Sequence, residues 1–151
     1  DPAALGLLLA GVYAIASLAQ VIVGRLIDRF PIKRVFLPIV AAQVVCFLLA
    51  ARADGWWFYA FAIAYMTFVF GAIPFTDAII ARFVDDSMRS RVAGLRLAVS
   101  FGFSSLAVWA LGPFVKASGF TVLLFTMAVI ASLTLLAVSF LPAHDPEPTP
   151  A

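Results

Sequence analysis

Residues 117–141 read ASGFTVLLFTMAVIASLTLLAVSFL, a run without a single charged side chain. A helix of about 20 apolar residues is long enough to cross the hydrocarbon core of a bilayer. The run does not alternate between apolar and polar residues, as a strand of a membrane barrel would. An open sheet is excluded as well, because its unpaired edges cannot be satisfied in lipid. This stretch therefore predicts a membrane-spanning α-helix.

The rest of the chain repeats this pattern. Of its 151 residues 64% are hydrophobic and 12% are charged, whereas a soluble domain is about half apolar and about a quarter charged. We predict an all-α integral membrane protein whose transmembrane domain covers residues 1–142. Its five transmembrane helices are expected at about residues 3–27, 35–51, 56–81, 87–115 and 117–141.

The basic residues indicate an orientation. They gather in two short segments between apolar runs, 24–34 and 82–96, whereas the other two connections hold only Arg52 and Lys116. Short basic loops favour the cytoplasmic side. The chain is therefore expected to start outside and end inside the plasma membrane, here a bacterial inner membrane. The proline-rich, acidic tail, residues 143–151, should be disordered in the cytoplasm.

Small residues follow one face of three predicted helices, which suggests that the first, third and fourth helices are interior and the other two face lipid. Such a stripe serves packing more often than a solute path. Its polar members are candidates to line a cavity: Gln20, Thr67, Ser105 and Trp109. Pro74, just after Gly71, should kink the third helix, either as a hinge or as a fixed bend.

The first basic segment, residues 24–34, reads GRLIDRFPIKR. It resembles the loop signature of the major facilitator superfamily, with a glycine, an acid four residues later, an adjacent base and a basic pair after a turn. Pro31 departs from the resemblance, since the family usually has glycine there. The resemblance implies a cytoplasmic gate in which the acid acts as a latch. The corresponding residues are Gly24, Asp28, Arg29, Lys33 and Arg34.

The second basic segment resembles the corresponding acidic-then-basic loop of the same family and contributes Arg89 and Arg91 to the expected gate. Family halves contain six helices built as three plus three. The resemblance therefore implies a fragment that lacks one helix at its start. The short tail suggests the C-terminal half, helices 8–12 of twelve, whose partner is the missing half of the same transporter.

Asp77 is the acid that most invites a functional role, because ionisable groups in membrane helices are costly and often functional. It lies about a turn and a half before Arg82, so a structural or gating ion pair and a role in proton coupling are both open. We find no sequence pattern for a metal, cofactor, nucleic acid or catalytic group.

The predicted function is secondary transport of a small solute by alternating access, with efflux or uptake and coupling to protons left open. The alternative is a non-transporting membrane assembly or scaffold module, in which Asp28 and the inner arginines would tolerate substitution. A membrane-embedded enzyme would need a polar catalytic cluster, and a channel a ring of like side chains, and neither is found.

Overall fold

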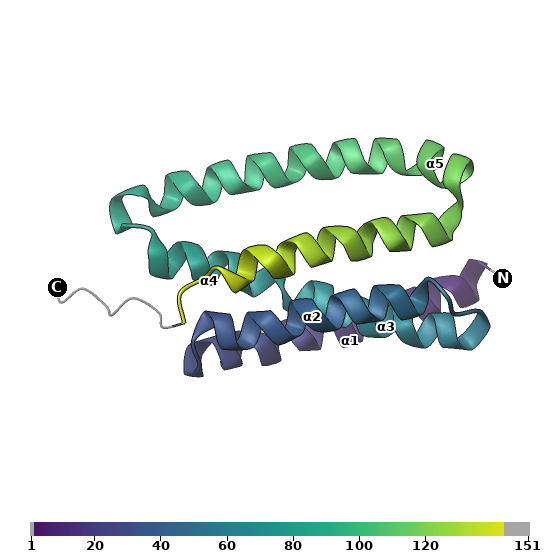
Figure 1. Ribbon diagram of the computed structural model, residues 1–151, viewed down its shortest axis with the longest axis horizontal. Helices are drawn as coiled ribbons and strands as arrows, with labels where there is room; N and C mark the ends of the chain where they lie inside the picture. The colour runs from purple at the N-terminus through teal and green to yellow at the C-terminus, as the bar shows by residue number, and fades with distance from the viewer. Residues whose placement is uncertain (1, 144–151) are drawn as a thin grey trace.

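The computed structural model describes residues 2–143, and over that range the secondary structure is entirely helical. The predicted all-α class is confirmed. Figure 1 shows long helices running side by side. They are α1 (Pro2–Arg29), α2 (Ile32–Ala50), α3 (Gly55–Gly71), α4 (Ile73–Phe83) and α5 (Asp86–Ser139). Of the predicted tail, residues 144–151 lie outside the described part.

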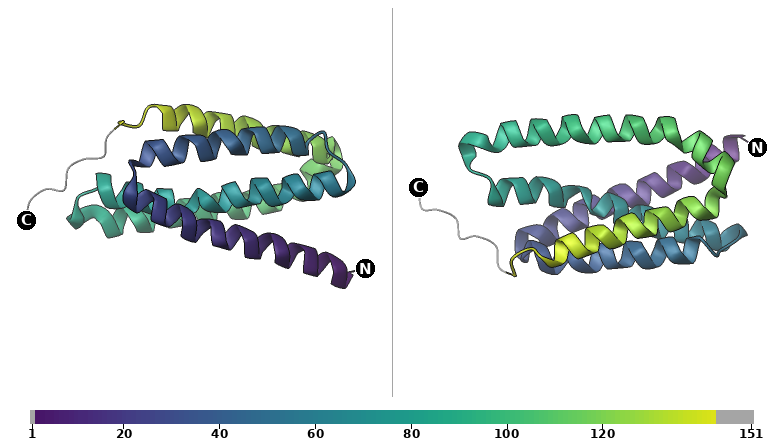
Figure 2. Two further views of the ribbon diagram at one scale, coloured as in Figure 1. Left: turned by 90° about the horizontal axis from the view of Figure 1, so that it is seen from below. Right: turned by 45° about the horizontal axis from the view of Figure 1, so that its top comes forward.

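Helix α5 is interrupted at Gly119. Its 54 residues would extend about 80 Å if straight, far beyond the roughly 30 Å of a bilayer core. Gly119 has φ 81° and ψ 165°, a conformation that suits a residue without a Cβ. The chain turns there, and the second arm runs back in the opposite direction, drawing apart from the first arm with distance from the turn (Figures 1 and 2). We expected the break near Lys116, and it comes a little later because glycine tolerates this turn. We call residues 86–118 the first arm and 120–139 the second arm.

The predicted third helix is divided into α3 and α4. The helices are separated at Ala72, and Pro74 stands in the first turn of α4. Proline has no N–H to donate, so the carbonyl four residues earlier, that of Phe70, loses its regular helical partner. The Phe75 N–H donates to the Ala72 carbonyl three residues back at 3.3 Å, which tightens the turn. Pro74 therefore breaks the helix locally, as its position predicts.

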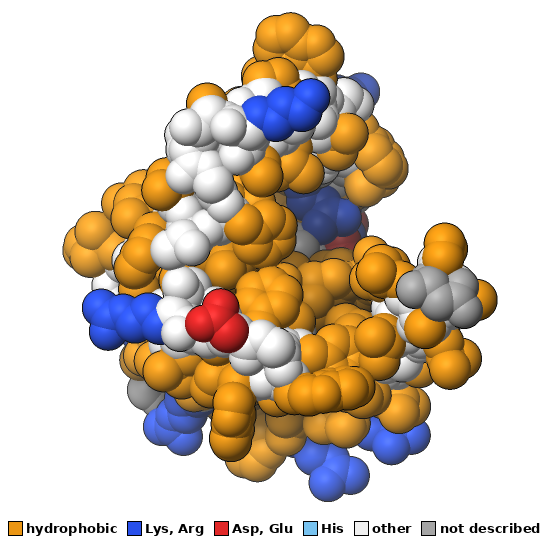
Figure 3. Space-filling view, turned by 90° about the vertical axis from the view of Figure 1, so that its right-hand side faces the viewer, with side chains coloured by type: hydrophobic (Ala, Val, Ile, Leu, Met, Phe, Trp, Pro, Cys, Tyr) orange, Lys and Arg blue, Asp and Glu red, His pale blue; other side chains and the backbone are white. Residues whose placement is uncertain are grey.

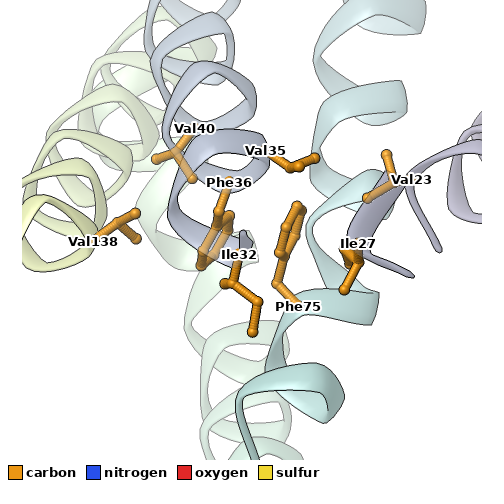
Figure 4. Packing of buried hydrophobic residues seen from close by; sticks show 8 residues of the cluster. All are labelled: Val23, Ile27, Ile32, Val35, Phe36, Val40, Phe75 and Val138. Carbon is orange, nitrogen blue, oxygen red and sulfur yellow. The ribbon is translucent and has the colours of Figure 1, made fainter. Parts of the chain in front are cut away.

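Helix α2 occupies the centre of the described residues, packed against α3 on one side and the second arm of α5 on another. Seven of its residues are buried, including Phe36 and Val40. Phe36 stacks on Phe75 of α4 with ring centroids 4.2 Å apart. The expectation that residues 35–51 form a peripheral helix is therefore wrong for the described chain. Figure 4 shows one buried cluster of this core, packed around the first half of α2: Val23, Ile27, Ile32, Val35, Phe36, Val40, Phe75 and Val138.

The first arm of α5 is the least covered helix. None of its residues is buried, whereas the second arm buries Leu124, Ala128, Ala131 and Val138. The expected interior position of the fourth predicted helix is therefore not seen among the described residues. The expected small-residue face of α1 is also open, because α1 buries Val12, Ala16, Val23 and Ile27 instead. Figure 2 shows the start of α1 splayed away from the other helices, and residues 2–10 are all exposed.

The exposed surface is largely apolar. Figure 3, which looks at the end carrying the start of the chain, shows hydrophobic side chains over most of the surface, with separate Lys and Arg side chains between and around them. By length and apolar composition, four helices among the described residues could cross a membrane when α3 and α4 are taken together and α5 is counted once. The chain is therefore an integral membrane protein of several spans. This count takes α5 as one helix, although the helix is interrupted at Gly119.

Candidate functional site

The charged side chains gather at one end of the bundle. Helix α1 ends and α2 begins there, α4 ends and α5 begins there, and the second arm of α5 returns to it (Figure 1). We call this region, formed by residues 24–34, 82–91 and 139–141, the basic end. The two segments singled out from the sequence thus lie at the same end of the structure. The candidate site consists of the basic end and the ion pair just inside it.

Lys33 binds the end of the last helix. Its Nζ donates to the carbonyl oxygens of Ser139 at 2.7 Å and Leu141 at 2.9 Å. The last four carbonyls of a helix have no partner within it, and a cation near them also opposes the helix dipole. Lys33 is one of the residues predicted for the gate, and in the structure it caps the end of α5 and ties the start of α2 to it.

Two arginines act in the same way on other helices. Arg82 of α4 donates to the Ile27 carbonyl in the last turn of α1. Arg89 of α5 donates to the Ala81 carbonyl of α4 at 2.7 Å, and its guanidinium also lies 2.6 Å from Asp86. Three helix C-termini, those of α1, α4 and α5, are thus each capped by a cation from another helix. Part of the positive charge of the two basic segments thus caps helix ends.

The predicted latch acid is exposed. Asp28 lies in the last turns of α1, and its carboxylate makes no hydrogen bond or ion pair within residues 2–143. Arg29 and Arg91 are also exposed. A Cβ added at Gly24 would meet no atom within 4 Å, so no helix of the described chain approaches it closely. The structure therefore does not form the expected latch from these residues by themselves.

Asp77 pairs with Arg96. One Asp77 carboxylate oxygen lies 2.8 Å from the Arg96 guanidinium, which joins α4 to the first arm of α5. The Arg96 side chain is 26% exposed and that of Asp77 is 64% exposed. The Nε of Arg96 is buried and has no hydrogen-bond partner among the described residues. The sequence pointed to Arg82 as the neighbouring base, but that residue reaches α1 instead.

The four candidate lining residues lie on three helices. Thr67 donates to the carbonyl of Ile63 in its own helix at 2.7 Å. Gln20 is half-buried, Ser105 is exposed and the Trp109 side chain is 76% exposed. No hydrogen bond joins any two of the four within residues 2–143. The described chain thus leaves the two candidates on the first arm open and does not gather the four into one site.

Gly71 and Gln43 fix the packing around the break between α3 and α4. A Cβ at Gly71 would come within 3.3 Å of the Val23 Cγ2, so α1 passes close to α3 there. Gln43 is only 8% exposed, and its Nε2 donates to the Phe68 carbonyl of α3 at 2.9 Å. Sequence analysis did not single out Gln43, although a lone amide in an apolar run signals a hydrogen bond between membrane helices.

A family model described as Major Facilitator Superfamily matches residues 1–151, the whole chain. The chain belongs to the major facilitator superfamily. This superfamily consists of membrane transporters, and the facilitator described here is therefore a membrane transporter. The predicted resemblance to this superfamily is confirmed. No curated protein and no solved structure matches the chain.

Membership of this superfamily also indicates what kind of chemistry the facilitator performs. A transporter family needs groups that bind and release a solute rather than groups that make or break bonds, which agrees with a non-enzymatic function. Among residues 2–143, no group of three or more His, Cys, Asp or Glu side chains is placed to hold a metal ion.

Proposed function

We propose that this chain is five helices of the C-terminal six-helix half of a facilitator, helices 8–12 of twelve, which transports a small solute by alternating access. Helices α1 and α2, the α3–α4 unit and the two arms of α5 would each cross the membrane once. The turn at Gly119 supports this count, since either arm alone is long enough to span. The basic end and the C-terminus would be cytoplasmic, in keeping with the positive charge there.

The Asp77–Arg96 ion pair carries this proposal. Charges inside a membrane segment are costly unless they are paired or face water, and they commonly mark ion or solute pathways. Asp77 lies on α4, the part of the third span that follows the break at Ala72. Because the break interrupts the helix, α4 can tilt relative to α3, with Gly71 and Pro74 as the hinge. The ion pair would then couple that tilt to the first arm, and so act as a gate.

The open face of the first arm supports a solute path beside this gate. Nothing within 4 Å would meet a Cβ at Gly94, Gly102 or Gly112, and Ser105 and Trp109 on the same arm are exposed. We infer that the missing half of the transporter faces this arm, with the solute between the two halves. Residues 97–115 of the arm carry no charged side chain, which favours a solute that is neutral or weakly charged. Asp28, Arg29 and Arg91 would then meet the other half as the cytoplasmic latch.

The experiment is transport by the full-length protein reconstituted in liposomes, with a panel of small solutes tested under an imposed pH gradient. Once a solute is found, Asp77→Asn and Arg96→Gln are each expected to lower the initial rate about tenfold, the equivalent of about 1.4 kcal/mol. The double change Asp77→Arg with Arg96→Asp should restore part of the rate, since it rebuilds the pair. Asp86→Asn is the matched control, because it removes an exposed pair of little energetic worth.

The outcome also separates two roles for Asp77. If Asp77→Asn stops pH-driven uptake but leaves solute exchange intact, and the charge swap does not rescue uptake, Asp77 carries the proton. If the swap rescues transport, the pair is a gate. Wild-type transport in both single variants would contradict any part for this ion pair in the cycle.

A further inference from the structure

An apolar groove with a basic rim lies at the basic end, on the outside of the α1–α2 hairpin. It has a volume of about 320 Å³ and is open along one side. Its wall comes from the last turn of α1, the residue that follows it and the first two turns of α2. The lining residues are Leu26, Phe30, Arg34, Val35, Pro38 and Ile39. Since the segment enters the predicted cytoplasmic half of the bilayer, this groove would open toward the lipids of the inner leaflet.

The rim of the groove is positively charged. Arg34 is exposed, and its guanidinium makes no hydrogen bond or ion pair within residues 2–143. Arg25 and Arg29 are exposed on the last two turns of α1, and Asp28 is the only acid in residues 24–34. The Lys33 ammonium lies at the end of α5, where it uses two of its three N–H donors. Arg34 is therefore the cation placed to receive an anionic group at the mouth of the groove.

Pro38 adds a hydrogen-bond acceptor to the same wall. Proline inside a helix has no N–H, so the carbonyl of Arg34, four residues earlier, loses its regular helical donor. An acceptor left without its donor in an apolar setting is costly, and a hydroxyl or ammonium group would satisfy it. Arg34 and Pro38 both line the groove. The same residue, Arg34, thus supplies a guanidinium donor and a backbone acceptor that lacks its helical donor.

The lining argues for a lipid chain rather than another helix. Membrane helices associate through small residues that let their backbones approach. This wall consists of leucine, isoleucine, valine, phenylalanine and proline around one arginine, with no glycine or alanine. Basic pockets between membrane helices on the cytoplasmic side are the places where anionic lipid headgroups bind.

We propose that this groove binds one anionic phospholipid of the inner leaflet. The lipid phosphate contacts the Arg34 guanidinium, the headgroup hydroxyl donates to the Arg34 carbonyl, and an acyl chain lies along Leu26, Phe30 and Ile39. Because the site joins the end of α1 to the start of α2, a bound lipid would brace the hairpin that carries the latch segment. The proposal does not depend on which solute is transported.

Native mass spectrometry of the full-length protein tests the site. The detergent-solubilised protein is mixed with equal amounts of palmitoyl-oleoyl phosphatidylglycerol and phosphatidylcholine, and the ratio of retained lipids is measured. The wild type should prefer phosphatidylglycerol. Arg34→Gln should lower that preference about fivefold, the effect of one arginine near an anionic lipid surface. Arg52→Gln, in the exposed turn after α2 at the opposite end, is the charge-matched control and should change nothing.

A second variant tests the groove itself. Leu26→Trp fills the wall with a bulky side chain and should displace both lipids, while the unfolding temperature reports whether the protein remains folded. If Arg34→Gln leaves the lipid ratio unchanged, the proposed headgroup contact is wrong. If Leu26→Trp retains the wild-type amount of phosphatidylglycerol, the acyl chain does not lie along this wall and the lipid groove is overturned. If soluble glycerol phosphate competes as well as the lipid, the site binds a free anion by charge alone, which overturns the lipid groove as well.

Discussion

Replacing Lys33 with methionine should loosen the end of the last helix. Lys33 donates two hydrogen bonds, to the carbonyls of Ser139 and Leu141. The other side-chain bond to a carbonyl of this last turn within the described residues is local, from the Ser139 hydroxyl to the Leu136 carbonyl. Methionine has a similar length and keeps most of the apolar contact of the lysine stem, but it cannot donate. The change therefore removes the two bonds and the favourable charge at the helix terminus while preserving the packing.

The size of the effect follows from these contacts. A hydrogen bond from a charged donor contributes about 1.5–3 kcal/mol net when it is well shielded. The bond to Ser139 is exposed and the bond to Leu141 is only partly buried, so water compensates much of the loss. We expect a total of about 1–2 kcal/mol, confined to the end of the helix. This corresponds to local opening that is about 5- to 30-fold more frequent.

Hydrogen–deuterium exchange of the full-length protein measures this opening directly. The amides of Phe140 and Leu141, which donate to Ala137 and Val138, should exchange 5- to 30-fold faster (about 1–2 kcal/mol) in Lys33→Met. Lys116→Met, at the opposite end, is the matched control and should leave them unchanged. If Lys33→Met shows wild-type exchange at Phe140 and Leu141 but loses transport, the capping role is wrong, and Lys33 acts in the gate.

Two further predictions concern the packing of α3. Gly71→Val should destabilise the protein by about 1–3 kcal/mol in detergent unfolding, because the added atoms meet Val23; an unchanged stability would show that α1 and α3 do not approach there. Gln43→Leu should lower the free energy of unfolding by only about 0.6 kcal/mol, and by at most about 1.7 kcal/mol, because it removes one hydrogen bond between membrane helices. The Phe68 carbonyl keeps a partner, since it still accepts from the Ala72 N–H. A loss above about 3 kcal/mol would mean that Gln43 has partners beyond α3.

Apolar runs and their interruptions predict much of this fold. Charge-free segments indicated membrane helices because a bilayer demands length and apolarity together, and Pro74 predicted the break in the third one. Gly119 was harder to recognise as the turn in α5, because Lys116 offered a more obvious polar interruption nearby. Which helix lies at the centre could not be predicted, since in an apolar chain nearly every face looks suitable for burial.

The candidate site was only partly predictable for a related reason. Sequence analysis found that Lys33 and Arg89 belong to the basic end, but loop charge says nothing about whether a cation binds a helix terminus or a partner half. The ion pair between Asp77 and Arg96 depends on how α4 and the first arm are positioned relative to one another. The short turn between the two helices sets that position, and its geometry could not be predicted from the sequence. Arg82 was closer in sequence, yet it points to α1.

The most direct test of alternating access is the water accessibility of Ser105 on the open face of the first arm. Ser105→Cys, in a background without other cysteines, is treated with a membrane-impermeant maleimide from either side of oriented vesicles. Alternating access predicts labelling from both sides and protection by solute, while Val129→Cys on the exposed surface of the second arm stays unlabelled. If Ser105→Cys is unlabelled from both sides under every condition, this face meets lipid or another helix, and the proposed solute path is wrong.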